Sequence, residues 1–247
     1  MLKGFWKLTW VETKVFVREP MGFVGTIGLP VVVFLLLGRM LRVGRMDVTP
    51  GFTAPFNVAI VAALFIALGN VQSLVAIIAI YREGGILKRL RATPLSPVTI
   101  LGAQVFVKLS FALLSLGLLM LAGKRVFPGV MQVNLLSFAA ALLLGTLSIL
   151  SLGFVLASIV PTARFAQPIS TAVLYPMVAL SGAFFPVERL PRALQIVALG
   201  LPTTHAVSLM QGVWDGSGWA AHWLSVVALI LLFALFVAVS TKVFRWE

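Results

Sequence analysis

The sequence contains no cysteine and very few acidic residues. Without cysteine there is no disulfide framework, no thiolate nucleophile and no cysteine-based metal site. Asp and Glu together number 7 and His numbers 2 in 247 residues, so groups for acid–base catalysis or metal binding are scarce. Charged residues make up only 11% of the chain, about half of what a soluble domain carries. These shortages argue against a water-soluble fold and against most classes of enzyme.

The chain is rich in apolar residues and in cations. Hydrophobic residues make up 60% of it and its mean hydropathy is +1.08. The 19 Lys and Arg residues give a net charge of +12. In a membrane protein an excess of cations sets the orientation of loops, so we interpret it as topology rather than as nucleic-acid binding. A secretory signal peptide is not expected, because the first apolar run continues to Gly38 and meets Arg39 instead of a small-residue cleavage site.

Stretches without charge predict six transmembrane helices. A helix needs about 20 largely apolar residues to cross the hydrocarbon core of a bilayer. With six spans, more Lys and Arg fall in the segments on the same side of the membrane as the N-terminus than in those on the opposite side. This predicts that both termini are cytoplasmic and that the protein lies in the cell membrane. We expect an all-α integral membrane protein with a single domain over residues 1–247. The predicted spans lie near 21–41, 58–80, 103–123, 135–159, 167–186 and 222–242.

The segment 193–214 is ambiguous. Its dense apolar part, residues 193–201, is about half as long as a span and ends at Pro202. A segment of this kind is typical of a re-entrant structure, so we expect an outer helical hairpin at about 187–212. The alternative is a seventh span, which would place the C-terminus outside.

The first 20 residues predict an amphipathic helix that lies in the inner membrane interface. Aromatic and apolar side chains fall on one arc of this helix and cations on the adjoining arc. Trp side chains are suited to the headgroup level and cations to anionic lipid. We expect the helix to anchor the protein, although direct contact with a partner is also possible for it. The predicted anchor residues are Lys3, Trp6, Lys7, Trp10 and Lys14.

The loop between the second and third predicted spans contains a short basic helix. Gly84 and Gly85 break the preceding helix, residues 86–91 can form about two turns, and Pro94 ends them. The charge of this loop would be ordinary for an inner loop. A short helix between helix breakers can also transmit force, which a flexible basic loop cannot.

The region before the last span contains several prolines and small residues. Pro176 predicts a kink within a span, and Ser181, Gly182 and Ala183 permit close approach of helices. A charged turn and a return segment follow, which together fit an outward-facing hairpin of two half-helices. The predicted hairpin and gate residues are Pro186, Glu188, Arg189, Pro191, Pro202 and His205.

These two segments resemble the signatures of the ABC-2 type permeases, the six-span subunits of drug-resistance and lipo-oligosaccharide exporters. The first signature, a Glu, a Gly and a Thr-Pro-Leu-Ser element, is matched by Glu83, Gly84 or Gly85 and residues 93–96. The second is matched by Leu180, Ser181, Gly182, Phe185, Pro186, Leu190, Pro191, Leu194, Gln195 and Pro202. Gln211 stands where family members often have Arg, so no role of that Arg is transferred.

The resemblance implies the permease subunit of an ATP-driven exporter with an amphiphilic cargo such as a drug, a lipid or a glycolipid. It implies a homodimer in contact with membrane lipid, a separate ABC ATPase that carries ATP and magnesium, and no nucleic acid, metal or catalytic residue in this chain. The nearest string to a phosphate-binding loop, Gly117 to Lys124, has the wrong spacing and is followed by Arg125. In the family the first loop is the coupling helix, at about 82–97, that docks on the ATPase. The implied contact residues are Arg82, Glu83, Gly84, Gly85, Leu87, Lys88, Leu90, Arg91, Thr93 and Pro94.

Two other classes of protein remain as alternatives. An ion- or proton-coupled secondary carrier needs ionisable groups within the membrane, and Lys108 is the candidate in a predicted span. We expect Lys108 to reach the inner surface with its long side chain, and His205 to be a hydrogen-bonded structural residue. An intramembrane hydrolase is disfavoured, because the chain has neither a His-Glu-x-x-His nor a Gly-x-Ser-x-Gly motif and the nearest acid to His205 is Asp215.

Overall fold

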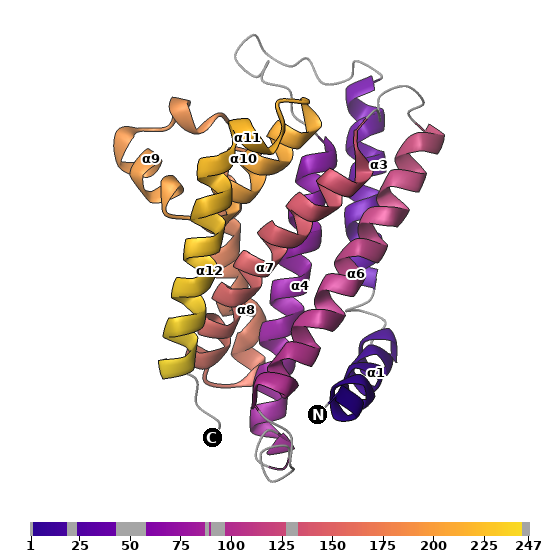
Figure 1. Ribbon diagram of the computed structural model, residues 1–247, viewed down its shortest axis with the longest axis vertical. Coiled ribbons are helices and arrows are strands. Elements are labelled where there is room, and N and C mark those ends of the chain that lie inside the picture. The colour runs from indigo at the N-terminus through magenta and orange to yellow at the C-terminus, as the bar shows by residue number, and fades with distance from the viewer. Residues whose placement is uncertain are drawn as a thin grey trace.

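The protein is a bundle of helices, as a computed structural model presents it (Figure 1). The structure describes residues 2–18, 24–42, 58–86, 89, 97–126 and 133–243, and in this part of the chain all regular structure is helical. The elements are α1 (Leu2–Arg18), η1 (Val24–Gly28), α3 (Leu29–Arg42), α4 (Val58–Glu83), α6 (Pro97–Val126), α7 (Leu135–Ile159), α8 (Ala163–Ala179), η2 (Val187–Arg189), α9 (Arg192–Leu199), α10 (Pro202–Trp214), α11 (Gly218–Ala221) and α12 (Trp223–Val243).

Four of the described helices are long and apolar enough to cross a membrane. They are α4, most of α6, α7 and α12, and the pair α9 and α10, bent by 82°, would make a fifth if it counts as one span. The chain is therefore a multi-pass membrane protein. The segments η1–α3 and α8 are shorter, so the count of six spans stays a prediction.

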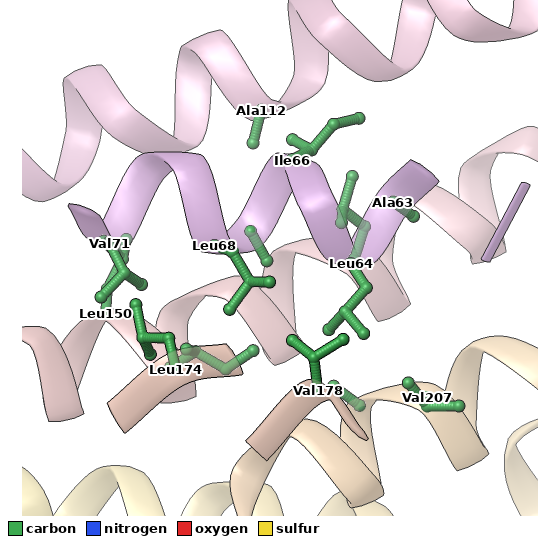
Figure 2. Packing of buried hydrophobic residues seen from close by; sticks show 14 of the residues in the cluster. Ala63, Leu64, Ile66, Leu68, Val71, Ala112, Leu150, Leu174, Val178 and Val207 are labelled. Carbon is green, nitrogen blue, oxygen red and sulfur yellow. The ribbon is translucent and has the colours of Figure 1, made fainter. Parts of the chain in front are cut away.

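The centre of the bundle is α4, which is apolar on all sides and packs against α3, α6, α7 and α8. Figure 2 shows its side chains meeting those of the neighbouring helices, with Leu68 and Val71 near Leu150 and Leu174. Most of α12 is instead exposed, as expected of a helix at the edge of a bundle in lipid. The core therefore fixes α4 from several sides while α12 covers one edge.

Small residues allow α7 to approach its neighbours closely. A Cβ atom added at Gly145 would lie 2.8 Å from Cβ of Ala206 in α10, and one added at Gly153 would lie 3.0 Å from Cγ1 of Val71 in α4. Close backbone approach at small residues is a common way to pack helices in membranes, where apolar burial alone gives little driving force. These two glycines set the spacing of α7 from α10 and α4.

The helix bounds agree best with the sequence where a span is flanked by clear charges or caps. Helix α7 covers 135–159 as expected, with the Asn134 side chain accepting hydrogen bonds from the amides of Leu136 and Ser137. In contrast, the helix expected over 167–186 lies at Ala163–Ala179. It ends early because a turn follows, in which Gly182 has a φ of 84° and the Ser181 hydroxyl donates to the Val178 carbonyl.

The first predicted span begins with a π-helical turn, η1, that leads into α3. Pro30 has no amide hydrogen, so it cannot donate to the carbonyl of Thr26 as an α-helical residue would. The hydroxyl of Ser115 in α6 lies 3.5 Å from that carbonyl oxygen and supplies a donor instead. The irregular start of this segment is thus stabilised from a neighbouring helix.

Candidate functional site

The predicted coupling segment begins where α4 ends. Helix α4 includes Arg82 and Glu83, and a turn follows in which Gly85 has a φ of 65°. After the break, the amide of Arg89 donates to the Gly85 carbonyl at 3.2 Å. The contact residues Leu87, Lys88, Leu90, Arg91, Thr93 and Pro94 lie outside the described residues.

Arg82 ties the end of α4 to the end of α7. Its Nη1 donates to the Ala157 carbonyl at 3.1 Å and its Nη2 donates to the Val160 carbonyl. The last carbonyls of a helix have no partner within the helix, so a cation here satisfies them and also interacts favourably with the helix dipole. Sequence reasoning assigned Arg82 only to the ATPase contact. It also fixes the start of the coupling segment to a second helix.

A buried polar cluster lies beside the same end of α4. The Tyr81 hydroxyl lies 2.8 and 2.9 Å from the two carboxylate oxygens of Glu12 in α1. Glu12 is only 3% exposed. Burial raises the pKa of its carboxyl, while Tyr81, Gln104 and Lys108 lower that pKa by smaller amounts. Sequence reasoning missed this cluster because its members come from three separate helices.

The expectation that Lys108 reaches the inner surface is wrong. Lys108 is 1% exposed, its Nζ donates to Ser73 Oγ at 2.6 Å, and it lies 4.3 Å from the ring centroid of Phe16. The reason is that α1 packs on α6 (Figure 1) and places Phe16 over Lys108. The cation is therefore held by a hydroxyl and an aromatic face, and it lies near enough to Glu12 to lower the pKa of that carboxyl.

The predicted anchor residues lie on the opposite face of α1. Trp6 and Trp10 are 54% and 61% exposed, and Lys7 and Lys14 are exposed as well. The Lys14 ammonium lies 5.1 Å from the Trp10 ring centroid. The side chain of Lys3 is outside the described residues. The helix thus divides into a buried face of Thr9, Glu12 and Phe16 and an exposed face of Trp and Lys. Trp6 still contacts Phe106 of α6, with ring centroids 5.6 Å apart.

The segment of the predicted hairpin contains a bend of 82° between α9 and α10. Gln195 Nε2 donates to the carbonyls of Glu188 and Leu190, which ties η2 to α9. His205 Nε2 lies 2.9 Å from the Leu199 carbonyl oxygen. Because a carbonyl only accepts, this nitrogen carries the proton in that hydrogen bond, which agrees with a structural role for His205.

The other hairpin residues separate into a packed and an exposed group. Pro202 is buried at the start of α10, whereas Glu188, Arg189 and Pro191 are exposed and Pro186 is half-buried. The hydroxyl of Thr203 donates to the Met177 carbonyl at 3.0 Å and joins α10 to α8. The hairpin is therefore fixed at Pro202 and open at the charged turn.

Polar side chains that the sequence analysis did not single out lie between α4 and α8. Gln72 Nε2 lies 3.4 Å from Thr171 Oγ1, and Gln167 Nε2 donates to Gln72 Oε1 at 3.2 Å. Gln167, Thr171 and Tyr175 repeat every four residues and so share one face of α8, which we name the α8 polar stripe. Gln167 and Tyr175 are exposed. Exposed amides within a membrane bundle are costly in lipid and favour a wet or protein-covered surface.

Among the described residues, no group of three or more His, Asp or Glu side chains could hold a metal ion. The described site combines the end of α4, which is hydrogen-bonded to α1 and α7, with the α8 polar stripe and the bent pair of helices α9 and α10. A multi-pass bundle with these parts defines a membrane transport protein. The chain belongs to the ABC-2 type transporter family, whose sequence model matches residues 3–214.

Characterised relatives carry the same kind of description. The chain is 28% identical over 166 residues to the inner membrane transport permease YhhJ of Escherichia coli K12, covering 66% of this chain and 44% of that protein. It is 34% identical over 99 residues to nodulation protein J of Rhizobium leguminosarum bv. viciae, covering 40% of this chain and 38% of that protein. The matches thus span less than half the length of these relatives.

Proposed function

We propose that the chain is the membrane-spanning permease subunit of an ATP-driven exporter. ATP and magnesium bind to a separate ABC ATPase chain, which is the usual partner of ABC-2 permeases, and this chain supplies the transport pathway. Two copies of the permease pair with two ATPases, because the described spans of one copy form only part of a pathway. The cargo is amphiphilic, in keeping with an apolar bundle that offers few charges.

The observation that carries the proposal is the attachment of the coupling segment. The segment leaves α4 at Gly85, directly after Arg82, which donates hydrogen bonds to the end of α7. A push on the segment is therefore applied to α4 and α7 together. These two helices pack along their length at Gly153 and Val71, so they move as one body.

The pathway is lined by the α8 polar stripe and by Gln72 of α4. Gln167 and Thr171 of the stripe are hydrogen-bonded to Gln72, and Gln167 and Tyr175 are exposed. In a dimer they would face the second copy across a wet cavity. Cargo enters from the inner leaflet or the cytosol and leaves past the bent hairpin of α9 and α10.

In this proposal both termini are cytoplasmic. Helix α1, the end of α4 at Glu83 and the end of α12 lie at the same end of the bundle (Figure 1). That end also carries the cations of α1 and Arg82, in keeping with the positive-inside rule. A location in the cell membrane agrees with the name of the permease YhhJ.

The proposal is tested by purifying the permease in detergent together with its ATPase subunit. Replacing Glu83 and Arg89 by Ala should weaken copurification and lower the ATPase rate of the complex, because these residues flank the break in the coupling segment. Asp215→Asn is the matched control, since Asp215 is exposed at the other end of the bundle. If the complex and its activity survive the loss of Glu83 and Arg89, the coupling assignment is wrong.

The same preparation distinguishes the exporter from a secondary carrier. Transport that continues without any ATPase and stops when the proton gradient is collapsed would contradict the proposal. Lys108→Met would then be the next variant to examine, because Lys108 is a buried cation within α6.

A further inference from the structure

Helix α1 presents its one acidic residue to the bundle and its cations to the surroundings. Glu12 is the only Asp or Glu in Leu2–Arg18 and is buried, whereas Lys7, Lys14 and Arg18 are exposed. An amphipathic helix that only lies on a membrane would keep a carboxylate at its wet edge, because burying one is costly unless it is paired. The inward placement of Glu12 therefore indicates a specific attachment.

The attachment joins three helices. Glu12 of α1 accepts the hydrogen bond of Tyr81 in α4, and Gln104 and Lys108 of α6 lie on its other side. Phe16, one turn further along α1, covers Lys108 and packs on Phe111 with ring centroids 4.3 Å apart. Aromatic rings thus cover the Lys108 side of this polar cluster and keep water from it.

The attachment lies one helical turn before the coupling segment. Tyr81 precedes Arg82, and the helix breaks at Gly85. The end of α4 is therefore held on one side by α1 through Tyr81 and on another side by α7 through Arg82. Any tilt of α4 at this end must either carry α1 along or break the hydrogen bond to Glu12.

We propose that Glu12 and Tyr81 form a latch between α1 and the end of α4, and that they act as positioning residues for coupling. The role in coupling rests on the proposed exporter function, whereas the latch itself does not. With the latch closed, α1 moves with α4. With the latch open, movement of the end of α4 is no longer transmitted to α1 through Tyr81.

Protonation of Glu12 favours the closed latch. The groups around the carboxyl are Tyr81 from α4 and Gln104 and Lys108 from α6. Burial is the largest influence and raises the pKa of Glu12 in the docked helix above that in a released helix. The docked helix therefore binds the proton more tightly than the released helix does. Docking is strongest at a pH below the pKa that Glu12 has in the released helix. It weakens as the pH rises through the higher pKa that Glu12 has in the docked helix.

A single cysteine reports on the latch, because the native chain has none. Thr9 is buried against the bundle and its hydroxyl has no hydrogen-bond partner, so Thr9→Cys is a mild change. Its rate of reaction with a hydrophilic maleimide measures how often α1 lifts. Lys7→Cys, on the exposed face of the same helix, gives the rate without protection, and the ratio of the two rates removes the effect of pH on the thiol.

The permease alone tests the latch, with no ATPase present. Tyr81→Phe and Glu12→Ala should raise the ratio of the Thr9→Cys rate to the Lys7→Cys rate by about tenfold, the usual effect of leaving a buried hydrogen-bonding group without its partner. Glu12→Gln keeps an oxygen that accepts from Tyr81, so the ratio should stay low and become independent of pH. Tyr175→Phe is the matched control for loss of a hydroxyl, since Tyr175 is exposed on α8.

The complex with the ATPase tests the role in coupling. Addition of a non-hydrolysable ATP analogue should change the Thr9→Cys rate in the native background, and Tyr81→Phe should abolish this change while the complex still copurifies. An unchanged rate in Tyr81→Phe and Glu12→Ala permease would overturn the latch. A closed latch with no response to the nucleotide would overturn its role in coupling, whereas failure of the complex to form would count against the exporter function alone.

Discussion

The contact between α7 and α10 at Gly145 allows a sharp test of the packing. A Cβ atom at this position would lie 2.8 Å from Cβ of Ala206, whereas ordinary contacts begin at about 3.4 Å. Both atoms are attached directly to helix backbone, so no side-chain rotation relieves the overlap. Gly145→Ala must separate α7 and α10 by about 0.6 Å or distort them.

The expected cost of Gly145→Ala follows from this geometry. Overpacking of a core by one methyl group costs about 1–3 kcal/mol. For a chain of this length each kcal/mol lowers the Tm by about 2–4 °C. The expected result is a Tm several degrees below that of the native permease in the same detergent, measured by the loss of the monodisperse peak after heating.

Two further variants separate overpacking from a general effect of Ala. Gly117→Ala in α6 is the control, because a Cβ atom there meets nothing within 4 Å, and it should be neutral or slightly stabilising. Combining Gly145→Ala with Ala206→Gly removes the clash, since the nearest atom is then the Cα of residue 206 at 3.6 Å. The combined variant exchanges one Gly and one Ala between two helices, so its stability should return to within about 1 kcal/mol of the native value. A combined variant no more stable than Gly145→Ala would refute this account of the contact.

Three other variants test the ends of the bundle. Gly85→Ala should lower the stability by about 1–2 kcal/mol through the φ of 65° alone, because a Cβ there meets nothing within 4 Å. Gly85→Asn should lower it by less. If both variants are as thermally stable as the native chain, the turn geometry is contradicted. Gly212→Ala places a Cβ 2.1 Å from Cδ2 of His222 and should displace that ring from Ser208 and Ser217, which a shift of its NMR resonances would reveal. Arg82→Met keeps the apolar stem and removes the donors to α7, so hydrogen exchange at residues 157–160 should accelerate while exchange in the middle of α7 stays unchanged.

The sequence predicts the helices of the core well, because their signal is local. About 20 apolar residues between charges can hardly be anything but a membrane helix, and α4, α7 and α12 start and end close to where the charges predict. The break at Gly84 and Gly85 is equally local, since it depends on two adjacent residues. The N-terminal helix was also expected from its periodicity.

What the sequence cannot predict are the contacts between segments far apart in the chain. Glu12 and Tyr81 are 69 positions apart, and Arg82 and Ala157 are 75 apart. From the sequence alone, Glu12 is an ordinary acid on an amphipathic helix and Arg82 is an ordinary cation of an inner loop. The expectation that Lys108 reaches the inner surface is wrong for the same reason. Only the packing of α1 on α6 determines that this side chain is buried.

Several of these long-range contacts meet on α4. Tyr81 and Arg82 hold its end to α1 and α7, Gln72 holds its middle to the α8 polar stripe, and Ser73 accepts from Lys108 of α6. Because α4 is buried on nearly all sides by apolar side chains, sliding it past its neighbours would break close packing along its whole length. A tilt about the tightly packed middle keeps that packing and moves the end instead. We therefore expect force at Gly85 to tilt α4 with α7 as a rigid body, and hydrogen exchange within α4 to stay slow in every nucleotide state of the complex. Rapid exchange at residues 66–75 in one of those states would contradict the rigid tilt.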